Sequence, residues 1–311
     1  MARSDFVHLH VHSQYSLLDG ACQLPQLVER AVQMEMPAVC LTDHGNIFGA
    51  IEFYLLARQK GIKPIIGCET YVSATSRFTR GDPHQKSLFY HLTLLIKNEQ
   101  GYRNLLRLIS IANSEGFYYK PRIDGEVLAR HAAGLVGLSG CLKGEIAALL
   151  LAGRSEQATQ RARELASLFE PESFFLEVMD HGLPEQKKVN PLLRRLSEET
   201  GIPLVATNDV HYLKKEMARA HEILLCLQTQ TTLADPNHMR MSAPEFYFKS
   251  PEEMRALFAD MPEALHNTLR VAEMCTLELN LHKTHLPTFK VPAGITDIEF
   301  LRRECAERLR A

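Results

Sequence analysis

Seven short apolar runs, each ending in a residue that can bind a metal, restrict the possible fold more than any other feature of the sequence. The first run ends in His10 and His12, and the last contains Asp209 and His211. Successive side chains of a strand point to opposite faces, so the two members of each pair share a face. Ligand pairs of this kind, repeated from strand to strand, indicate a site for several metal ions at one rim of a barrel.

The apolar runs are short and rich in β-branched residues or leucine, which is typical of buried parallel strands. We expect strands at residues 6–12, 38–43, 63–72, 89–97, 135–140, 174–179 and 203–209. Helical periodicity lies between most of them, at residues 24–34, 49–59, 100–112, 145–152, 156–169 and 185–200. Pro191 should kink the last helix or start a new one. This alternation predicts an α/β fold with a seven-unit (β/α) barrel, whose chemistry lies where the strands end.

The sequence after His211 changes to a mainly helical pattern. Helices are expected at residues 215–227, 251–260, 262–275 and 297–311, with an irregular, proline-containing stretch at 276–294. We therefore predict a barrel domain with its following helices over residues 1–275. Residues 276–311 are predicted to be a linker and the truncated start of a further domain.

Charge and cysteine content exclude several classes of protein. The 311 residues carry 35 Lys and Arg against 37 Asp and Glu, so net charge gives no general signal for nucleic-acid binding. Seven cysteines, an odd number without a CxxC pair, favour reduced thiols in the cytoplasm over a disulfide framework. No signal peptide is recognisable and no apolar run approaches the ~20 residues of a membrane span, so no membrane partner is expected.

Nine residues in or just after the predicted strands could bind metal. They are His10, His12, Asp19, His44, Glu69, His91, Cys141, Asp209 and His211. Imidazole suits zinc, iron or manganese, and carboxylates suit manganese or magnesium. Glu69 could bridge two ions, and nine ligands suffice for two or three divalent ions.

The segments that carry these residues resemble a known family. HLHVHSQYSLLDG, LTDHGNIFGAIEFY, GIKPIIGCE, FYHLTLL, LSGCLKGEI and ATNDVHY are similar to the PHP (polymerase and histidinol phosphatase) domain. More narrowly, with GYRNLLRLIS, EGFYYKPRID and HGLPEQKKVN, they resemble the PHP domain at the N-terminus of bacterial replicative DNA polymerase III alpha subunits. The resemblance covers about residues 5–290.

The resemblance implies a distorted seven-stranded, TIM-like (β/α) barrel of the PHP type with up to three metals. The ligand positions of the family fall on the same nine residues, and all nine can bind metal here. Some polymerase members have lost several ligands and keep the domain as a scaffold, whereas members with the full set resemble active 3′→5′ exonucleases. Two ions about 3.5–4 Å apart can clamp a phosphodiester and activate a water. Asp43 would shuttle a proton or hold a ligand imidazole in its tautomer.

Other histidines and a group of basic and aromatic residues have plainer alternatives. His8 is expected to be a hydrogen-bonded core histidine and His221 a packed helix residue. Most members of a further group are expected to be solvated, namely His84, His131, His181, His238, His266, His282 and His285. Residues that could bind single-stranded DNA through phosphate contacts and base stacking are Arg77, Arg80, Lys86, Tyr118, Tyr119, Lys120 and Arg122. The alternative for this group is a solvated loop.

Three functions are consistent with these features of the sequence. The first is the PHP module of a replicative polymerase alpha subunit, with metal-dependent 3′→5′ exonuclease activity for proofreading on a primer 3′ end or single-stranded DNA. Its partners would be the rest of the alpha subunit and other replicase subunits. The second is a metal-stabilised, non-catalytic scaffold that supports the polymerase and a separate proofreading nuclease. The third is a stand-alone phosphomonoesterase of the histidinol-phosphatase type. Nucleotide polymerisation is not expected from this chain.

Overall fold

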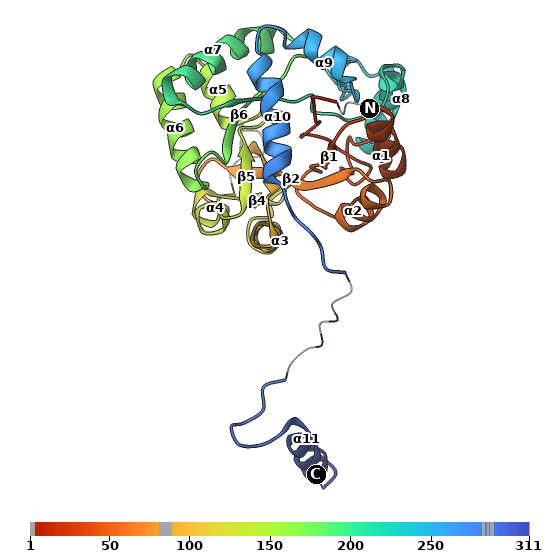
Figure 1. Cartoon of the computed structure of the whole chain (residues 1–311), viewed down its shortest axis with the longest axis vertical. Helices are drawn as coiled ribbons and strands as arrows, with labels where there is room; N and C mark the ends of the chain where they lie inside the picture. Colours follow the sequence, from red (N-terminus) through yellow and green to blue (C-terminus); the bar gives the residue numbers. More distant parts are fainter. Residues whose placement is uncertain (1–3, 81–88, 282–283, 285, 287–288, 311) are drawn as a thin grey trace. The chain divides into compact units, whose positions relative to one another are not determined.

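The computed structural model describes residues 4–80, 89–281, 284, 286 and 289–310 (Figure 1). The chain divides into two compact units, Met1–Glu278 and Leu279–Ala311. The first unit holds all seven strands and ten of the α-helices of the described residues. The second contains α11 (Asp297–Arg308), which begins at a capping box of Thr296 and Glu299.

A strongly curled seven-stranded sheet forms the centre of the first unit, which confirms the predicted α/β fold class. The strands are β1 (Ala38–Leu41), β2 (Lys63–Ser73), β3 (Phe89–Ile96), β4 (Arg122–Ile123), β5 (Leu135–Leu138), β6 (Phe174–Val178) and β7 (Leu204–Ala206). They pair in the order β1-β2-β3-β5-β6-β7, and the short β4 pairs with β2. Six of these strands agree with predicted runs, whereas β4 was not predicted.

Strand β3 runs antiparallel to both of its neighbours, so the expectation of parallel strands is wrong there. Parallel neighbours need a crossover connection, usually a helix. The sequence between β2 and β3 has no helical period, and the chain returns beside β2 in the opposite direction. The other pairs, including β1 with β2 and β6 with β7, are parallel.

Residues 6–12 form an extended segment between β1 and β7 instead of the predicted ladder strand. Its amide at His12 donates to the carbonyl of Val210 (2.7 Å), and the amide of Thr42 donates to the carbonyl of Val11 (2.8 Å). Two other backbone donors of the segment are taken by side chains, since Val11 donates to Thr42 Oγ1 (2.8 Å) and Val7 donates to a threonine of a later helix (3.1 Å). The segment therefore closes the curled sheet without forming a regular ladder.

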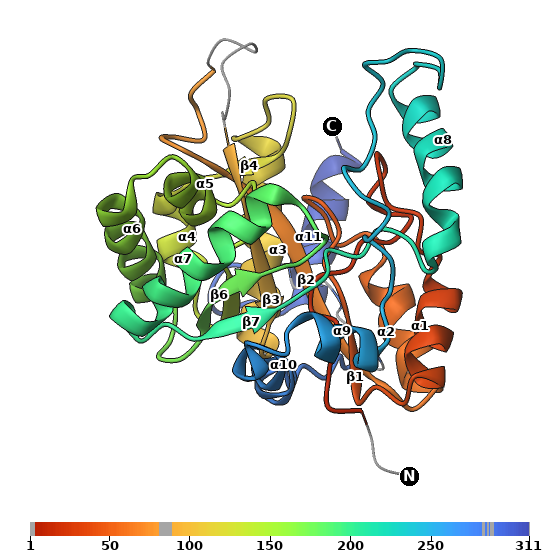
Figure 2. The same cartoon turned by 90° about the horizontal axis from the view of Figure 1, so that it is seen from above.

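Helices surround the sheet (Figures 1 and 2). Those of the first unit are α1 (Leu24–Gln33), α2 (Ala50–Gln59), α3 (Glu99–Ser114), α4 (Gly125–His131), α5 (Glu145–Leu151), α6 (Ser155–Leu168), α7 (Pro184–Thr200), the 3₁₀ turn η1 (Lys215–Met217), α8 (Ala218–Gln228), α9 (Pro251–Leu257) and α10 (Pro262–Met274). Helix α7 passes through Pro191 as one helix, and the expected restart does not occur. Helix α4, absent from the prediction, begins where Asp124 accepts from the amide of Val127.

A core of aliphatic and cysteine side chains fills the interior of the curled sheet. It includes Leu9, Cys40, Ile65 and Leu138, and Val271 of α10 packs in the same cluster. Burying one such aliphatic side chain contributes about 1.5–3 kcal/mol. Cys40 is fully buried there. Among the described residues, no helix is both long and apolar enough to cross a membrane.

Candidate metal centre

Glu69, near the end of β2, is the hub of the candidate centre. It is 1% exposed, and its Oε1 and Oε2 lie 2.6 Å from His91 Nδ1 and His44 Nδ1. His10 Nε2 approaches Oε1 to 3.5 Å, and His12 Nε2 approaches Oε2 to 3.7 Å. Four imidazoles from three separate parts of the chain thus converge on one buried carboxylate.

A second carboxylate, Asp209, lies just after β7 on the same side of the centre. Its Oδ1 is 3.1 Å from His12 Nε2, 3.5 Å from His10 Nε2 and 3.6 Å from His211 Nδ1. The pairs expected to share a strand face therefore do face the same point.

Asp19 and Cys141 complete the set from two loops. Asp19 Oδ1 lies 3.3 Å from His44 Nε2 and its Oδ2 lies 3.9 Å from His211 Nε2. Cys141 Sγ lies 3.9 Å from Glu69 Oε1. The structure brings together all nine residues that the sequence singled out as ligands.

Six of the nine residues have a buried side-chain atom without a hydrogen-bond partner among the described residues. The buried orphans include His10 Nε2, His12 Nε2, His44 Nδ1, Glu69 Oε2 and Asp209 Oδ1. The short approach of His44 Nδ1 to Glu69 Oε2 lacks hydrogen-bond geometry, so both atoms are aimed at a shared space. Buried polar atoms without partners are costly, by about 1–3 kcal/mol each. Bound cations would satisfy them, so these residues fit a metal centre.

Three overlapping groups in the described part of the chain have ligand atoms within 4.8 Å of one another. They are His12 with His44 and His211, His10 with His12 and Glu69, and His44 with Glu69 and His91. Overlap at His12, His44 and Glu69 is what a cluster of neighbouring ions would need, because a carboxylate can be shared between two ions.

Electrostatics keep the carboxylates ionised and at least one imidazole neutral. Burial opposes ionisation of Glu69, but its electrostatic interactions with the imidazoles of His91, His44 and His10 outweigh burial and hold its pKa well below the usual range. Burial, with repulsion from His44 and His211, lowers the pKa of His12 to about 3. A neutral His12 has a free lone pair on Nε2, which metal coordination requires.

Comparison with known proteins agrees with this geometry. The PHP domain family matches residues 8–181, more than half of the 311 residues. The chain belongs to the PHP domain family. This confirms the resemblance inferred from the sequence motifs.

The curated relatives are much longer proteins. DNA polymerase III subunit alpha of Treponema pallidum is 49% identical over 308 residues, which are 99% of this chain and 26% of that protein. The same subunit of Thermus aquaticus is 49% identical over 308 residues, 96% of this chain and 25% of the relative. This PHP domain chain spans about a quarter of the length of these relatives.

Solved structures are more distant. Histidinol phosphate phosphatase from Lactococcus lactis, complexed with zinc, L-histidinol and phosphate, aligns with 72% of this chain and 94% of its own. The TM-score of this alignment is 0.32 and the sequence identity is 13%.

Asp43 of this PHP domain reaches the ligands through a serine. Its Oδ1 accepts from Ser16 Oγ (2.8 Å) and from the amide of Ser13 (2.7 Å). Ser16 Oγ in turn lies 3.0 Å from His12 Nδ1. With Nδ1 donating to Ser16, the Nε2 of His12 faces the centre without a proton. Asp43 is thus placed to fix the tautomer of His12.

Glu177, on β6, is a functional residue that the sequence reasoning missed. Its Oε1 lies 2.7 Å from His10 Nδ1 and accepts from Thr207 Oγ1 (2.6 Å). A carboxylate behind a ligand imidazole fixes the ring and raises its basicity. A single glutamate within the apolar run FFLEVM was the available signal.

The ligand Asp209 has a strained backbone that its neighbours hold in place. Its φ is +44°, in the left-handed region, which costs about 1–3 kcal/mol for a residue other than glycine. Asn208 Nδ2 donates to the carbonyl of Tyr247 (2.7 Å), and His181 Nε2 donates to the carbonyl of Asn208 (3.0 Å). His181, expected in solvent, is instead 2% exposed because this network needs it.

Other histidines take structural roles. His8 donates from Nε2 to the carbonyl of Lys249 (2.9 Å) in the core, as predicted. His221 is buried on α8 and donates to the carbonyl of Asp19 (2.6 Å). The expectation that His238 is solvated is wrong, since it is buried against Glu222 (2.7 Å).

Two of the residues proposed for DNA contact are buried and hydrogen-bonded within the protein, so the prediction that they bind DNA is wrong. Arg77 is buried, and its guanidinium donates to Glu115 (2.7 Å) and Asp124 (3.1 Å). Arg122 is 1% exposed and donates to the carbonyls of Arg77 (3.0 Å) and Gly116 (3.1 Å). These bonds occupy the guanidinium groups that phosphate binding would need.

The other five members of that group are more accessible or undescribed. Arg80 and Tyr119 are exposed, and Tyr118 and Lys120 are partly exposed. Lys86 lies outside the described residues. Contact of these residues with DNA stays a prediction.

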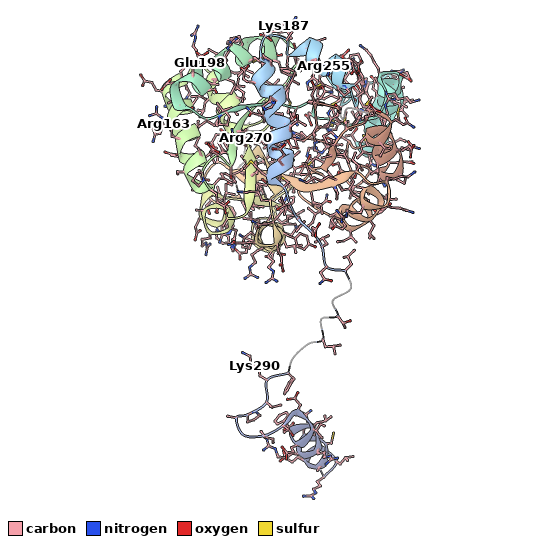
Figure 3. The ribbon with its side chains drawn as sticks, in the orientation of Figure 1. Arg163, Lys187, Glu198, Arg255, Arg270 and Lys290 are labelled. Carbon is pink, nitrogen blue, oxygen red and sulfur yellow. The ribbon has the colours of Figure 1, made fainter. Side chains whose placement is uncertain are left out.

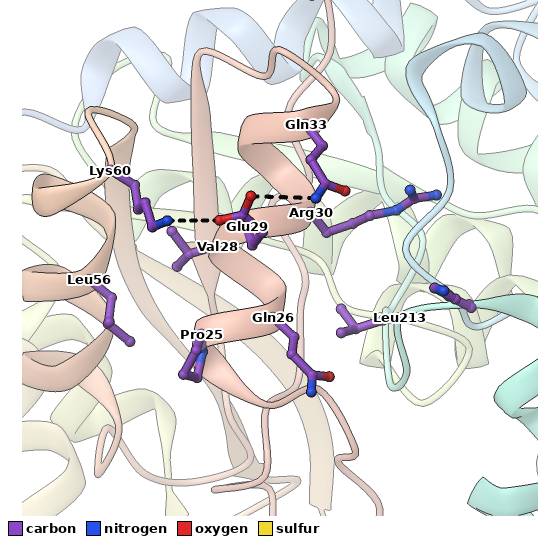
Figure 4. Close-up of a pocket in the computed structure, with 10 residues that line it drawn as sticks. Pro25, Gln26, Val28, Glu29, Arg30, Gln33, Leu56, Lys60 and Leu213 are labelled. Atoms are coloured by element: carbon purple, nitrogen blue, oxygen red, sulfur yellow. Dashed lines mark hydrogen bonds and ion pairs between the residues drawn. The ribbon is translucent and has the colours of Figure 1, made fainter.

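A separate groove of about 660 Å3 lies between α1 and α2 (Figure 4). Glu29 of α1 and Lys60 beyond α2 form a 2.9 Å ion pair there. The nine candidate ligands do not line this groove, so it is not part of the candidate metal centre.

Proposed function

We propose that this chain is the PHP module of a DNA polymerase III alpha subunit and that it hydrolyses phosphodiester bonds at the 3′ end of DNA with two or three divalent ions. The observation that carries the proposal is the convergence of nine ligand-type side chains, six of which have a buried polar atom without a hydrogen-bond partner among the described residues. The identity to the relatives supports the polymerase context.

Different groups of these residues would hold different ions. His10, His12 and Glu69 would hold one ion, and Glu69 with His44 and His91 a neighbouring one. Bound divalent ions supply charge neutralisation at the phosphoryl oxygens and a hydroxide near neutral pH.

The remaining residues would orient the metal ligands or add negative charge to the centre. Glu177 fixes the ring of His10, and Ser16 with Asp43 keeps the Nε2 of His12 open to the centre. Asp19 and Asp209 bring further negative charge, which favours a cluster of cations over a single one.

The proposal includes the protein partners of the chain and its location in the cell. The rest of the alpha subunit and other replicase subunits would be the protein partners, in the bacterial cytoplasm. Polymerisation would belong to the parts of the relatives that this chain does not match.

The test is a hydrolysis assay on a 3′-mismatched primer with added Mn²⁺ or Zn²⁺. We expect the His12→Ala and Asp209→Ala variants to lose at least about 100-fold in rate, because each removes a ligand. His8→Gln is the matched control, since His8 is buried in the same segment without facing the ligands. Unchanged rates in both ligand variants would contradict the proposal. Bound metal without turnover would favour the scaffold, and preference for a small phosphomonoester would favour the phosphatase.

A further inference from the structure

A cavity of about 260 Å3 lies over the candidate ligands. Its inner side is formed by seven of the nine, namely Asp19, His44, Glu69, His91, Cys141, Asp209 and His211. Its other walls come from the loop after β5, the end of β6, the start of α7 and the loop between α8 and α9. A ligand in this cavity would therefore touch the candidate metal centre on one side and these loops on the other.

The walls away from the ligands are mainly apolar. Leu142, Met179, Met239, Met241 and Phe246 line the cavity. The polar Gln186 and His181 in the wall are already bonded to each other, with Gln186 Nε2 donating to His181 Nδ1 (2.8 Å). Methionine thioethers adapt to many shapes. This wall thus offers an adaptable apolar surface with few free groups for reading base edges.

Two cations line the same cavity from two different loops. Lys143 follows Cys141, and Arg240 lies in the loop between α8 and α9. Both side chains are exposed, and neither forms an ion pair with another described residue. By contrast, the nearby Lys215 and Lys249 are both paired with Glu245. Unpaired cations beside a cavity attract anionic groups such as phosphates.

We propose that this cavity takes the terminal nucleotide of a single DNA strand, with Lys143 and Arg240 binding the phosphates next to the scissile one. The proposal rests on the proposed phosphodiesterase function and names its substrate subsite. A volume of about 260 Å3 is below the roughly 300–1,000 Å3 typical of small-ligand sites, so the cavity can take no more of a strand than its terminal nucleotide and is too small for a duplex. The methionine wall contacts the base without a preference among the four bases.

The apolar wall favours a nucleotide over a small phosphate ester as the substrate. A small phosphomonoester needs only the ions and the two cations, and it would leave Met239 and Met241 without a partner. A nucleoside supplies the apolar surface that these side chains can cover.

The test is binding of a labelled single-stranded oligonucleotide with phosphorothioate terminal linkages, which slow hydrolysis, to the full chain at several salt concentrations. We expect Lys143→Gln with Arg240→Gln to weaken binding at least about 10-fold. The slope of log affinity against log salt should fall by about 0.7 for each phosphate that the double variant no longer neutralises. Arg103→Gln with Arg163→Gln is the charge-matched control, because these residues lie exposed on α3 and α6 (Figure 3 shows Arg163) and do not line the cavity. Equal affinities and slopes in the two double variants would overturn the proposal.

A competition experiment tests the preference for a strand end. An unlabelled linear strand should compete, and a covalently closed circle of the same sequence should compete at least about 10-fold less. Equal competition by the circle would overturn the end-binding proposal even if hydrolysis is observed. Conversely, absent hydrolysis in the wild type, with the Lys143 and Arg240 effect intact, would contradict the proposed activity and leave this binding site supported.

Discussion

At the scale of single residues, the sequence singled out the nine candidate ligands that the structure brings together, but not the residues that hold them in place. The nine candidate ligands were identifiable because each lies in a short motif with a local signature, in or beside an apolar run. Glu177 and His181 were not, because their roles depend on partners far away along the chain, His10 and Asn208. The expectation that Arg77 contacts DNA was wrong for the same reason, because three carboxylates from later segments form ion pairs with its guanidinium group.

Removing the carboxylate behind His10 should weaken metal binding without unfolding the chain. We expect Glu177→Gln to lower metal affinity by about 10- to 100-fold, since the amide keeps the size but not the charge that orients and polarises the imidazole. A metal titration against a chromophoric chelator measures this. Glu164→Gln, an exposed position on α6, is the control. If both variants bind metal like the wild type, Glu177 has no role in holding the ligand.

The pH dependence of stability should include a contribution from His8. Burial lowers its pKa to about 4, against 6.5 in an unfolded chain, although the hydrogen bond to the Lys249 carbonyl opposes the shift. The unfolded chain then binds more protons between pH 6.5 and 4, so stability is lost as the pH falls through this window. The full effect is about 3 kcal/mol.

Urea unfolding of the metal-free chain at pH 7.5 and pH 5 tests this contribution. The loss of unfolding free energy on acidification should be smaller in His8→Gln than in the wild type, because glutamine does not titrate. An identical loss in both proteins would show that His8 is not kept neutral by the fold.

At the scale of elements, apolar periodicity located six of the seven strands and most helices, but it did not give their directions or their pairing. Strand β3 is antiparallel to its neighbours, and direction is not encoded in the period of a strand. Residues 6–12 read as a strand, yet side-chain acceptors at Thr42 and Thr268 take two of its backbone donors. Helix α4 is short, so its periodicity covers too few turns to be detected.

Because α3 packs closely against the turn before β5, any side chain at Gly101 should lower the stability of the fold. A Cβ at Gly101 would overlap the carbonyl oxygen of Gly134, which is backbone and cannot move aside. We expect Gly101→Ala to lower the unfolding free energy by about 1–3 kcal/mol despite the better helix propensity of alanine. Gly125→Ala in α4 is the control, because a Cβ there meets no atom within 4 Å. Thermal or urea unfolding of both variants measures this, and equal stability of both would contradict the packing argument.

At the scale of the whole molecule, a curled sheet brings chemistry from distant parts of the sequence to one rim. The ligands extend from His10 to His211, and the extended segment 6–12 closes the sheet beside β7 so that both ends of this range meet. The sequence predicted the gathering of these residues at strand ends. It did not predict the cavity over them, because Arg240 and Met241 come from an irregular loop whose position has no periodic signal.

The metal content of the purified chain tests whether the nine converging residues hold divalent ions. After incubation with Mn²⁺ or Zn²⁺ and exhaustive dialysis, elemental analysis should find two or three ions per chain in the wild type and in His8→Gln. The His12→Ala and Asp209→Ala variants should each retain at least one ion fewer. Wild-type chain with no bound metal, or ligand variants with the same metal content as the wild type, would contradict the account.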